Sequence, residues 1–163
     1  MNIPINSLTN KIKKLVDLCQ KNESDYGEDS SWFKEPTPNE IITKWEDEHN
    51  ILIPETYKEW LCFTNEAQIR NTLAHFYGPD KFVTNSMGLS EDFVVIADLS
   101  GDGEQLCFSK TNGNFIWIDH GEIETISDFS DVLDEIIRML KPESCLSPKM
   151  EELLIKMAEK YNK

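Results

Sequence analysis

The chain has 163 residues, of which 39% are hydrophobic and 28% charged, and its formal net charge is −14 at pH 7. This composition suits one globular domain with a core, and no run approaches the ~18 apolar residues of a membrane-spanning helix. So many negative charges argue against nucleic acids and anionic membranes as partners, because phosphate groups would be repelled. They favour a basic protein partner, with plain solubility as the alternative explanation.

Nothing near the N-terminus has the basic and apolar regions of a secretory signal. Four cysteines are scattered along the chain without any Cys-x-x-Cys pair: Cys19, Cys62, Cys107 and Cys145. We therefore expect reduced thiols and a cytoplasmic location, because structural disulfides are typical of secreted proteins.

An amphipathic helix is predicted first, because apolar residues recur at helical spacing at Leu8, Ile12, Leu15, Val16 and Cys19. Its other face carries a basic patch, which we interpret as solvated: Lys11, Lys13, Lys14 and Lys21. A polar linker rich in acidic residues follows, up to residue 36. Trp32 and Phe33 interrupt this linker, and we expect them to anchor it to the domain.

Two further helices are predicted next. Thr37 is placed to cap the first helix, and Asn50 to end it, because asparagine tolerates the left-handed conformation. Pro54 opens the second helix, at a position where a missing N–H costs nothing. Lys58 and the acidic run 46–48 are predicted to be exposed. Apolar stripes assign four residues of the pair to the core: Trp45, Tyr57, Trp60 and Leu61.

An antiparallel meander is predicted from residue 93 onward. The run 93–97 is apolar throughout, as in a central strand covered on both faces. Further strands are predicted at 105–109, 115–118 and 123–126, with Asn112-Gly113 as a hairpin signal. Residues 69–77 alternate more weakly, so the predicted sheet has about four to six strands.

Two amphipathic helices close the chain. The first begins at Ser127 or Asp128 and ends before Pro142, with an apolar stripe from Phe129 to Leu140. The second spans 147–162, and its stripe is Met150, Leu153, Leu154, Met157, Ala158 and Tyr161. Helices before and after a meander predict an α+β fold with helices packed on one side of the sheet.

The turn that begins at Asp98 resembles the first half of a calcium loop. Ser109 occupies the twelfth position, where such a loop needs a bidentate carboxylate. The glycines of the turn have a simpler role, because they allow the positive φ angles of a tight turn. We therefore predict no calcium site.

Other catalytic or metal-binding patterns are also incomplete. His49, His75 and His120 lie on separate predicted elements without metal-ligand spacing. Cys107 could meet His120 near a hairpin as a nucleophile pair, but its apolar neighbours in a strand favour packing. There is no P-loop, dinucleotide fingerprint or Gly-x-Ser-x-Gly motif. We predict no catalytic residue, no cofactor and no metal.

The helix pair and the turn after the first long strand share a recognisable set of residues: Glu46, Pro54, Tyr57, Lys58, Leu61 and Asn65, followed by Gly101-Asp102-Gly103. In their order and spacing these residues resemble the SMI1/KNR4 family, also called the SUKH superfamily. The chain departs from the pattern at Asn50 and Glu66, where glycine is common, and at Ile53, where leucine is usual.

The resemblance implies a single SMI1/KNR4-like domain over residues 1–163, with the family core at about 37–141. On this view an N-terminal helix and acidic linker occupy 7–36, and a C-terminal helix occupies 147–162.

Bacterial members of this superfamily commonly act as immunity proteins, so the resemblance implies a non-catalytic domain that neutralises a cognate polymorphic toxin. A basic nuclease is one such toxin, because an acidic surface can mimic phosphates and block a cationic cleft. The candidate contacts are acids in the loops and outer hairpins: Asp98, Asp102, Glu104, Asp119, Glu122 and Glu124. One alternative, implied by fungal members, is an intracellular regulatory scaffold in the control of cell-wall synthesis. An enzyme is the third alternative.

Overall fold

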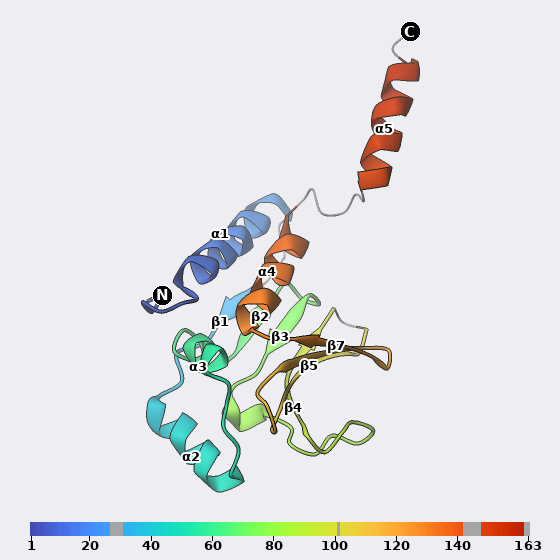
Figure 1. Ribbon diagram of the computed structural model, residues 1–163. Coiled ribbons are helices and arrows are strands. Elements are labelled where there is room, and N and C mark those ends of the chain that lie inside the picture. Colours follow the sequence, from blue (N-terminus) through green and yellow to red (C-terminus); the bar gives the residue numbers. More distant parts are fainter. Residues whose placement is uncertain (27–30, 101, 142–147, 162–163) are drawn as a thin grey trace.

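A seven-stranded antiparallel sheet follows the order of the chain, with helices before, within and after it (Figure 1). The computed structural model describes residues 1–26, 31–100, 102–141 and 148–161. The described helices are α1 (Thr9–Tyr26), α2 (Asn39–His49), α3 (Glu55–Leu61), η1 (Pro79–Lys81, a 3₁₀ turn), α4 (Phe129–Leu140) and α5 (Pro148–Tyr161). The strands are β1 (Trp32–Phe33), β2 (Ala67–Ile69), β3 (Ala74–Phe76), β4 (Phe93–Leu99), β5 (Glu104–Ser109), β6 (Phe115–Asp119) and β7 (Glu122–Ile126). The predicted α+β fold is confirmed.

The sheet is larger than predicted, with seven strands instead of about four to six. β3 lies within the weakly alternating residues 69–77, whereas β1 and most of β2 fall outside every predicted strand; these two have only two and three residues. Strands this short show too little alternation to be recognised in the sequence. Trp32 and Phe33 do anchor the linker as expected, because they pair with Gln68 and Ala67 of β2.

β4 is the central strand and is buried on both faces, as predicted. Its residues from Val94 to Ala97 are at most 2% exposed. Within segment 82–92, Val83 forms an isolated antiparallel bridge beside β4, through two backbone hydrogen bonds with Val95. Leu89 of this segment packs against a small apolar cluster formed by Val95, Cys107, Ile116 and Ile118.

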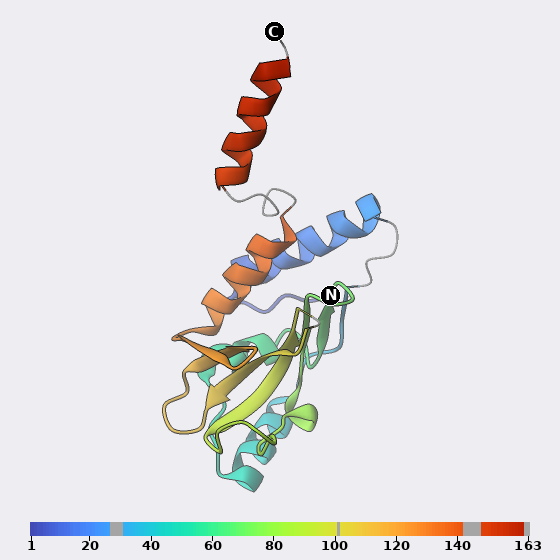
Figure 2. The same ribbon diagram turned by 90° about the vertical axis from the view of Figure 1, so that its right-hand side faces the viewer.

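Helices α1 to α4 pack on the other face. α1 and α4 lie side by side there (Figure 2), and Lys11 Nζ of α1 is 2.6 Å from Asp134 Oδ2 of α4. Asp128 caps α4 by accepting a 2.7 Å hydrogen bond from the Ser130 N–H. The predicted stripe of α1 is buried, and so is that of α4: Phe129, Val132, Leu133, Ile136, Ile137 and Leu140.

The helix pair α2 and α3 forms as predicted and contacts the central strand. Asn50 ends α2 in the left-handed conformation, with φ 52° and ψ 44°. The Tyr57 hydroxyl donates to the carbonyl oxygen of Tyr77 at 2.7 Å and lies 3.3 Å from that of Ile96, in the β-bulge of β4. The predicted core residues of the pair are all buried: Trp45, Tyr57, Trp60 and Leu61.

Glu46 and Lys58 differ from the prediction that both are freely exposed. Glu46 Oε1 accepts a 2.8 Å hydrogen bond from the Ile53 N–H and lies 2.9 Å from Lys58 Nζ. Both side chains are therefore mostly shielded and join α2, the apolar link and α3. The sequence could not show this, because a charged residue beside other charges reads as a solvated helix face.

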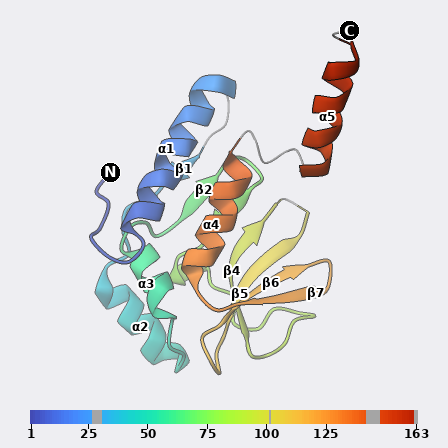
Figure 3. The same ribbon diagram turned by 45° about the horizontal axis from the view of Figure 1, so that its top comes forward.

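α5 also differs from the expectation that both C-terminal helices pack on the sheet. All three ribbon views show it extending away from the other elements (Figure 3). Leu153, Ile155 and Met157 are 62%, 59% and 48% exposed. The side chains of Met150, Leu154 and Tyr161 lie outside the described part of the chain, as do Cys145 and Gly101. No described helix is long and apolar enough to cross a membrane.

Asn65 joins three segments in the loop after α3. Its N–H donates to the Glu35 carbonyl oxygen at 2.8 Å, and its Oδ1 accepts a 2.8 Å hydrogen bond from Thr37 Oγ1. Thr37 therefore bonds to Asn65 and does not cap α2, contrary to the prediction. Gly78 lies so close that a Cβ there would stand 2.1 Å from Asn65 Oδ1 and 2.5 Å from its carbonyl oxygen.

We expect Gly78→Ala to destabilise the fold by about 3 kcal/mol, because the added methyl group would force Asn65 out of its contacts. Urea unfolding followed by circular dichroism measures this change. Gly88→Ala is the matched control: nothing lies within 4 Å of its Cβ position, although φ is +86°. That strain alone costs about 1 kcal/mol, so equal losses in the two variants would contradict the close-contact explanation.

Candidate functional site

The predicted contact acids lie near one end of the meander or along its β7 edge, but Asp98 is on the opposite face of the sheet from Glu124. Asp102 lies in the turn between β4 and β5, and Glu104 is the first residue of β5. Asp119 and Glu122 face each other as the last pair of the β6–β7 ladder, and Glu124 follows on the same face of β7. The antiparallel order of the strands brings these residues to one region.

The β6–β7 hairpin fixes this acidic end. His120 and Gly121 are its two loop residues, with φ values of 47° and 86°, which is the geometry of a tight hairpin turn that suits the twist of the strands. A hydrogen bond with Asp119 raises the pKa of His120, and the charges of Asp102 and Glu104 raise it further. The negative potential at this end therefore favours a protonated, cationic group.

Glu104 is more constrained than the prediction implied. Its Oε1 accepts a 2.6 Å hydrogen bond from Ser100 Oγ, and its Oε2 accepts a 2.8 Å hydrogen bond from Trp117 Nε1. The carboxylate thus orients the Trp117 indole, which is only 9% exposed and pairs across the ladder with Glu124. Glu104 supplies charge to the region while serving the fold.

A cleft of about 450 Å³ lies between β7 and α4. Trp117 and three carboxylates contribute to its walls, and the full lining is Trp117, Glu124, Thr125, Ile126, Ser127, Asp131 and Glu135. Glu135 is held by Arg138, whose Nη2 is 2.5 Å from its Oε1. An aromatic ring beside several carboxylates suits the side chain of a lysine or arginine.

Sequence reasoning missed Asp131 and Glu135. Their spacing of four residues does place them on one face of α4, but acids on a helix surface are common in so acidic a chain. Only the docking of α4 next to β7 brings them to Glu124.

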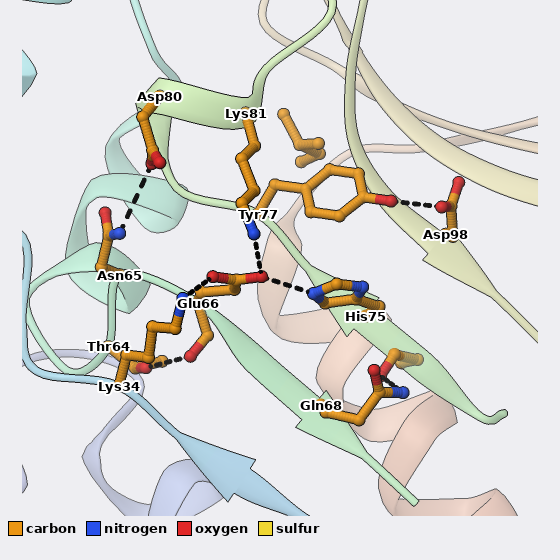
Figure 4. A network of polar contacts seen from close by, with 12 residues as sticks. Lys34, Thr64, Asn65, Glu66, Gln68, His75, Tyr77, Asp80, Lys81 and Asp98 are labelled. Carbon is orange, nitrogen blue, oxygen red and sulfur yellow. Dashed lines mark hydrogen bonds and ion pairs between the residues drawn. The ribbon is translucent and has the colours of Figure 1, made fainter. Parts of the chain in front are cut away.

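Asp98 is separated from the other candidates. In the ladder it lies opposite His75 of β3 and Gln105 of β5, on the face away from α4. Its carboxylate accepts a hydrogen bond from the Tyr77 hydroxyl (Figure 4). The structure therefore does not bring Asp98 into the same surface as the acids of the β7 edge.

A second polar group surrounds Glu66, which the sequence marked only as a departure from a family pattern. Its carboxylate is 3% exposed and receives Lys34, His75 and Lys81, from three different segments (Figure 4). The Lys81 Nζ and His75 Nε2 atoms lie 2.5 Å and 2.7 Å from Oε1. Lys34 also approaches the Trp32 ring, at 5.7 Å from its centroid.

The Glu66 group has the properties of a structural link. Burial alone would raise the pKa of Glu66, but hydrogen bonds from Lys34, Lys81 and His75 lower it to about 2. A carboxylate with this many donors is ionised and already satisfied. It joins the segment after β1, the start of β2, β3 and η1.

The described residues also locate the groups considered for catalysis or metal binding. Cys107 is buried in the cluster under segment 82–92, as the packing interpretation predicted, and burial raises its pKa to about 12. His120 is exposed and bonds to Asp119, and His75 bonds to Glu66. Among the described residues, no group of three or more His, Cys, Asp or Glu side chains is arranged to hold a metal ion.

Comparison with known proteins gives one family match. The model of the SMI1/KNR4 family (SUKH-1) matches residues 36–135, which include α2, α3, β2 to β7 and the first half of α4. No curated protein matches the chain.

We expect Glu66→Gln to destabilise the protein by about 2 kcal/mol at pH 7, because its three partners lose a charged acceptor. The folded-state pKa of about 2 lies below the ordinary 4.5, so this contribution is present above about pH 5 and is lost as pH falls toward 2. The stability gap between wild type and variant should therefore close over that range in urea unfolding experiments. Glu91→Gln, at an exposed acid, is the control; a gap independent of pH would contradict the ion-pair role.

Proposed function

The chain belongs to the SMI1/KNR4 family (SUKH-1), and from this premise we propose that it is a non-catalytic protein-binding domain of the immunity type. It binds a cognate polymorphic toxin in the cytoplasm and thereby neutralises it. The toxin domain is basic, and a nuclease is the class that best suits an acidic inhibitor.

The observation that carries this proposal is the grouping of acids at the β6–β7 hairpin and the β7–α4 cleft. Asp119, Glu122 and Glu124 project from adjacent strands, and Asp131 and Glu135 face Glu124 across the cleft. The whole chain has a net charge of −14, so its long-range field has the same negative sign as the acids that would contact the partner. Charge complementarity of this kind accelerates encounter and selects partners.

Neutralisation would follow from simple occupation of the toxin's active site. A nuclease cleft must be cationic to bind phosphates, and carboxylates at similar spacing can occupy the same positions. The fold supports this by holding the acids on a hairpin with a two-residue turn, so that little conformational entropy is lost on binding.

The proposal is tested with the toxin domain encoded by the neighbouring reading frame. We expect co-expression of this chain to restore growth of cells that produce the toxin domain. Asp119, Glu122 and Glu124 replaced together by lysine should weaken binding about a hundredfold, because several close charge pairs are lost. Calorimetry at low and high salt measures the affinity, which should fall as salt rises.

The matched control replaces Glu40, Asp47 and Glu48 of α2 by lysine, with the same change in net charge. We expect this control to bind within a few-fold of wild type, since only long-range attraction is reduced. Equal losses in the two variants, or an affinity independent of salt, would contradict the acidic contact surface. Recovery of several housekeeping proteins and no toxin in a pull-down would favour the regulatory scaffold instead.

A further inference from the structure

β7 is the last strand of the sheet, and no described strand pairs with its outer side. Figure 3 shows it on the side of the sheet opposite to β1 and β2. The side chains from Glu122 to Thr125 are all exposed, and Ile123 is 60% exposed. A strand of five residues with this exposure can pair with another extended segment.

The register shows which backbone groups of β7 point outward. Ser109 pairs with the start of β6, because its N–H donates to the Asn114 carbonyl oxygen at 2.9 Å. The backbone groups of Asn114 therefore point toward β5. Because their direction alternates from one residue to the next, the N–H and C=O groups of Trp117 and Asp119 point the other way, toward β7. Their partners in the ladder are Glu124 and Glu122.

Ile123 and Thr125 therefore direct their N–H and C=O groups away from β6, toward the outer edge. They offer two donors and two acceptors at the spacing of a ladder. Because a sheet hydrogen bond needs only the backbone of the partner, this edge can add a strand without rearrangement of the β6–β7 ladder.

The side chains specify what strand would fit. Glu122 and Glu124 lie on the face that opens to the cleft of Asp131 and Glu135, whereas Ile123 lies on the other face. If β7 of a second copy paired with this edge through Ile123 and Thr125, acidic side chains of the two copies would lie opposite each other. Like charges directly opposite in a ladder are destabilising. A strand with basic residues at alternate positions would pair favourably, by about 0.2–1 kcal/mol per opposite-charge pair.

The geometry points to β7 as a docking edge for an extended, basic segment of the protein partner. This segment adds an eighth strand, places lysine or arginine opposite Glu122 and Glu124, and sets an apolar side chain opposite Ile123. The basic side chain opposite Glu124 enters the cleft lined by Trp117, where the carboxylate of Asp131 receives it beside the Arg138-paired Glu135. The inference rests on the proposed function, because it identifies how the basic partner is held.

The test uses two synthetic peptides of equal composition and charge, both acetylated and amidated. One alternates, Lys-Val-Lys-Val-Lys-Val, and the other is blocked, Lys-Lys-Lys-Val-Val-Val. In the full, ¹⁵N-labelled chain we expect the alternating peptide to slow hydrogen exchange of the Ile123 and Thr125 amides about tenfold or more. Chemical-shift changes should centre on β7, Asp131 and Glu135, and the blocked peptide should bind at least several-fold more weakly. Equal behaviour of the two peptides, including no binding by either, overturns the inference.

Thr125→Pro separates the backbone contribution from that of charge. Proline removes the outward N–H while leaving the inward ladder intact, and it is tolerated on edge strands whose N–H faces solvent. Thr125→Val keeps the N–H and is the matched control. We expect Thr125→Pro to reduce affinity for the alternating peptide about tenfold and Thr125→Val to leave it unchanged, with both folds verified by their amide spectra.

The failures of the two proposals are distinguishable. Equal peptide affinity of Thr125→Pro and Thr125→Val would overturn strand addition, while salt-dependent toxin binding and growth rescue would leave the immunity function standing. Peptide pairing at β7 without growth rescue would show that the edge binds basic strands, and would contradict the proposed toxin neutralisation.

Discussion

Burial of β4 on both faces is the constraint on which the rest of this structure depends. An apolar strand in the middle of a sheet needs a covering layer on each side. Helices α1 to α4 cover one face, and Leu89 of segment 82–92 packs on the other. β7, three strands away, has exposed side chains and borders an open cleft instead of a second layer. The exposed strand and the cleft therefore lie at the edge of the meander.

The residues that carry the family resemblance serve the fold in this chain. Tyr57 bonds to backbone carbonyl groups beside the β4 bulge, and Glu46 links the Ile53 N–H to Lys58. Asn65 occupies the space beside Gly78, where the Cβ of any other residue would clash with it. These contacts fix how α2 and α3 sit against the sheet, so the signature residues serve the scaffold and lie apart from the proposed binding surface.

Charge has two different uses in this protein. Around Glu66 opposite charges are matched within a buried group that ties four segments together. Along β7 the side chains of Glu122 and Glu124 are exposed, which discourages pairing between copies and, under the proposed function, favours a basic strand. The net charge alone does not distinguish buried, paired acids from exposed ones, because it is the sum of all charges in the chain. Burial and the presence of nearby cations separate them.

The sequence by itself determined the long elements. Apolar periodicity in α1 and α4 reports directly which face is buried, and the continuous apolar run of β4 reports burial on both faces. It also determined the left-handed end of α2 at Asn50 and the hairpin at Asn112-Gly113, because these turns depend on local backbone preferences. Only the tertiary structure decided the pairing of β1 to β3, the link through Glu46 and the Glu66 group. It likewise decided the separation of Asp98 from the other acids and the meeting of Asp131 and Glu135 with Glu124. The physical reason is the same in each case. These contacts join residues that are distant in sequence, and neither a single charged residue nor a strand of two or three residues indicates which distant segment it will contact in the folded chain.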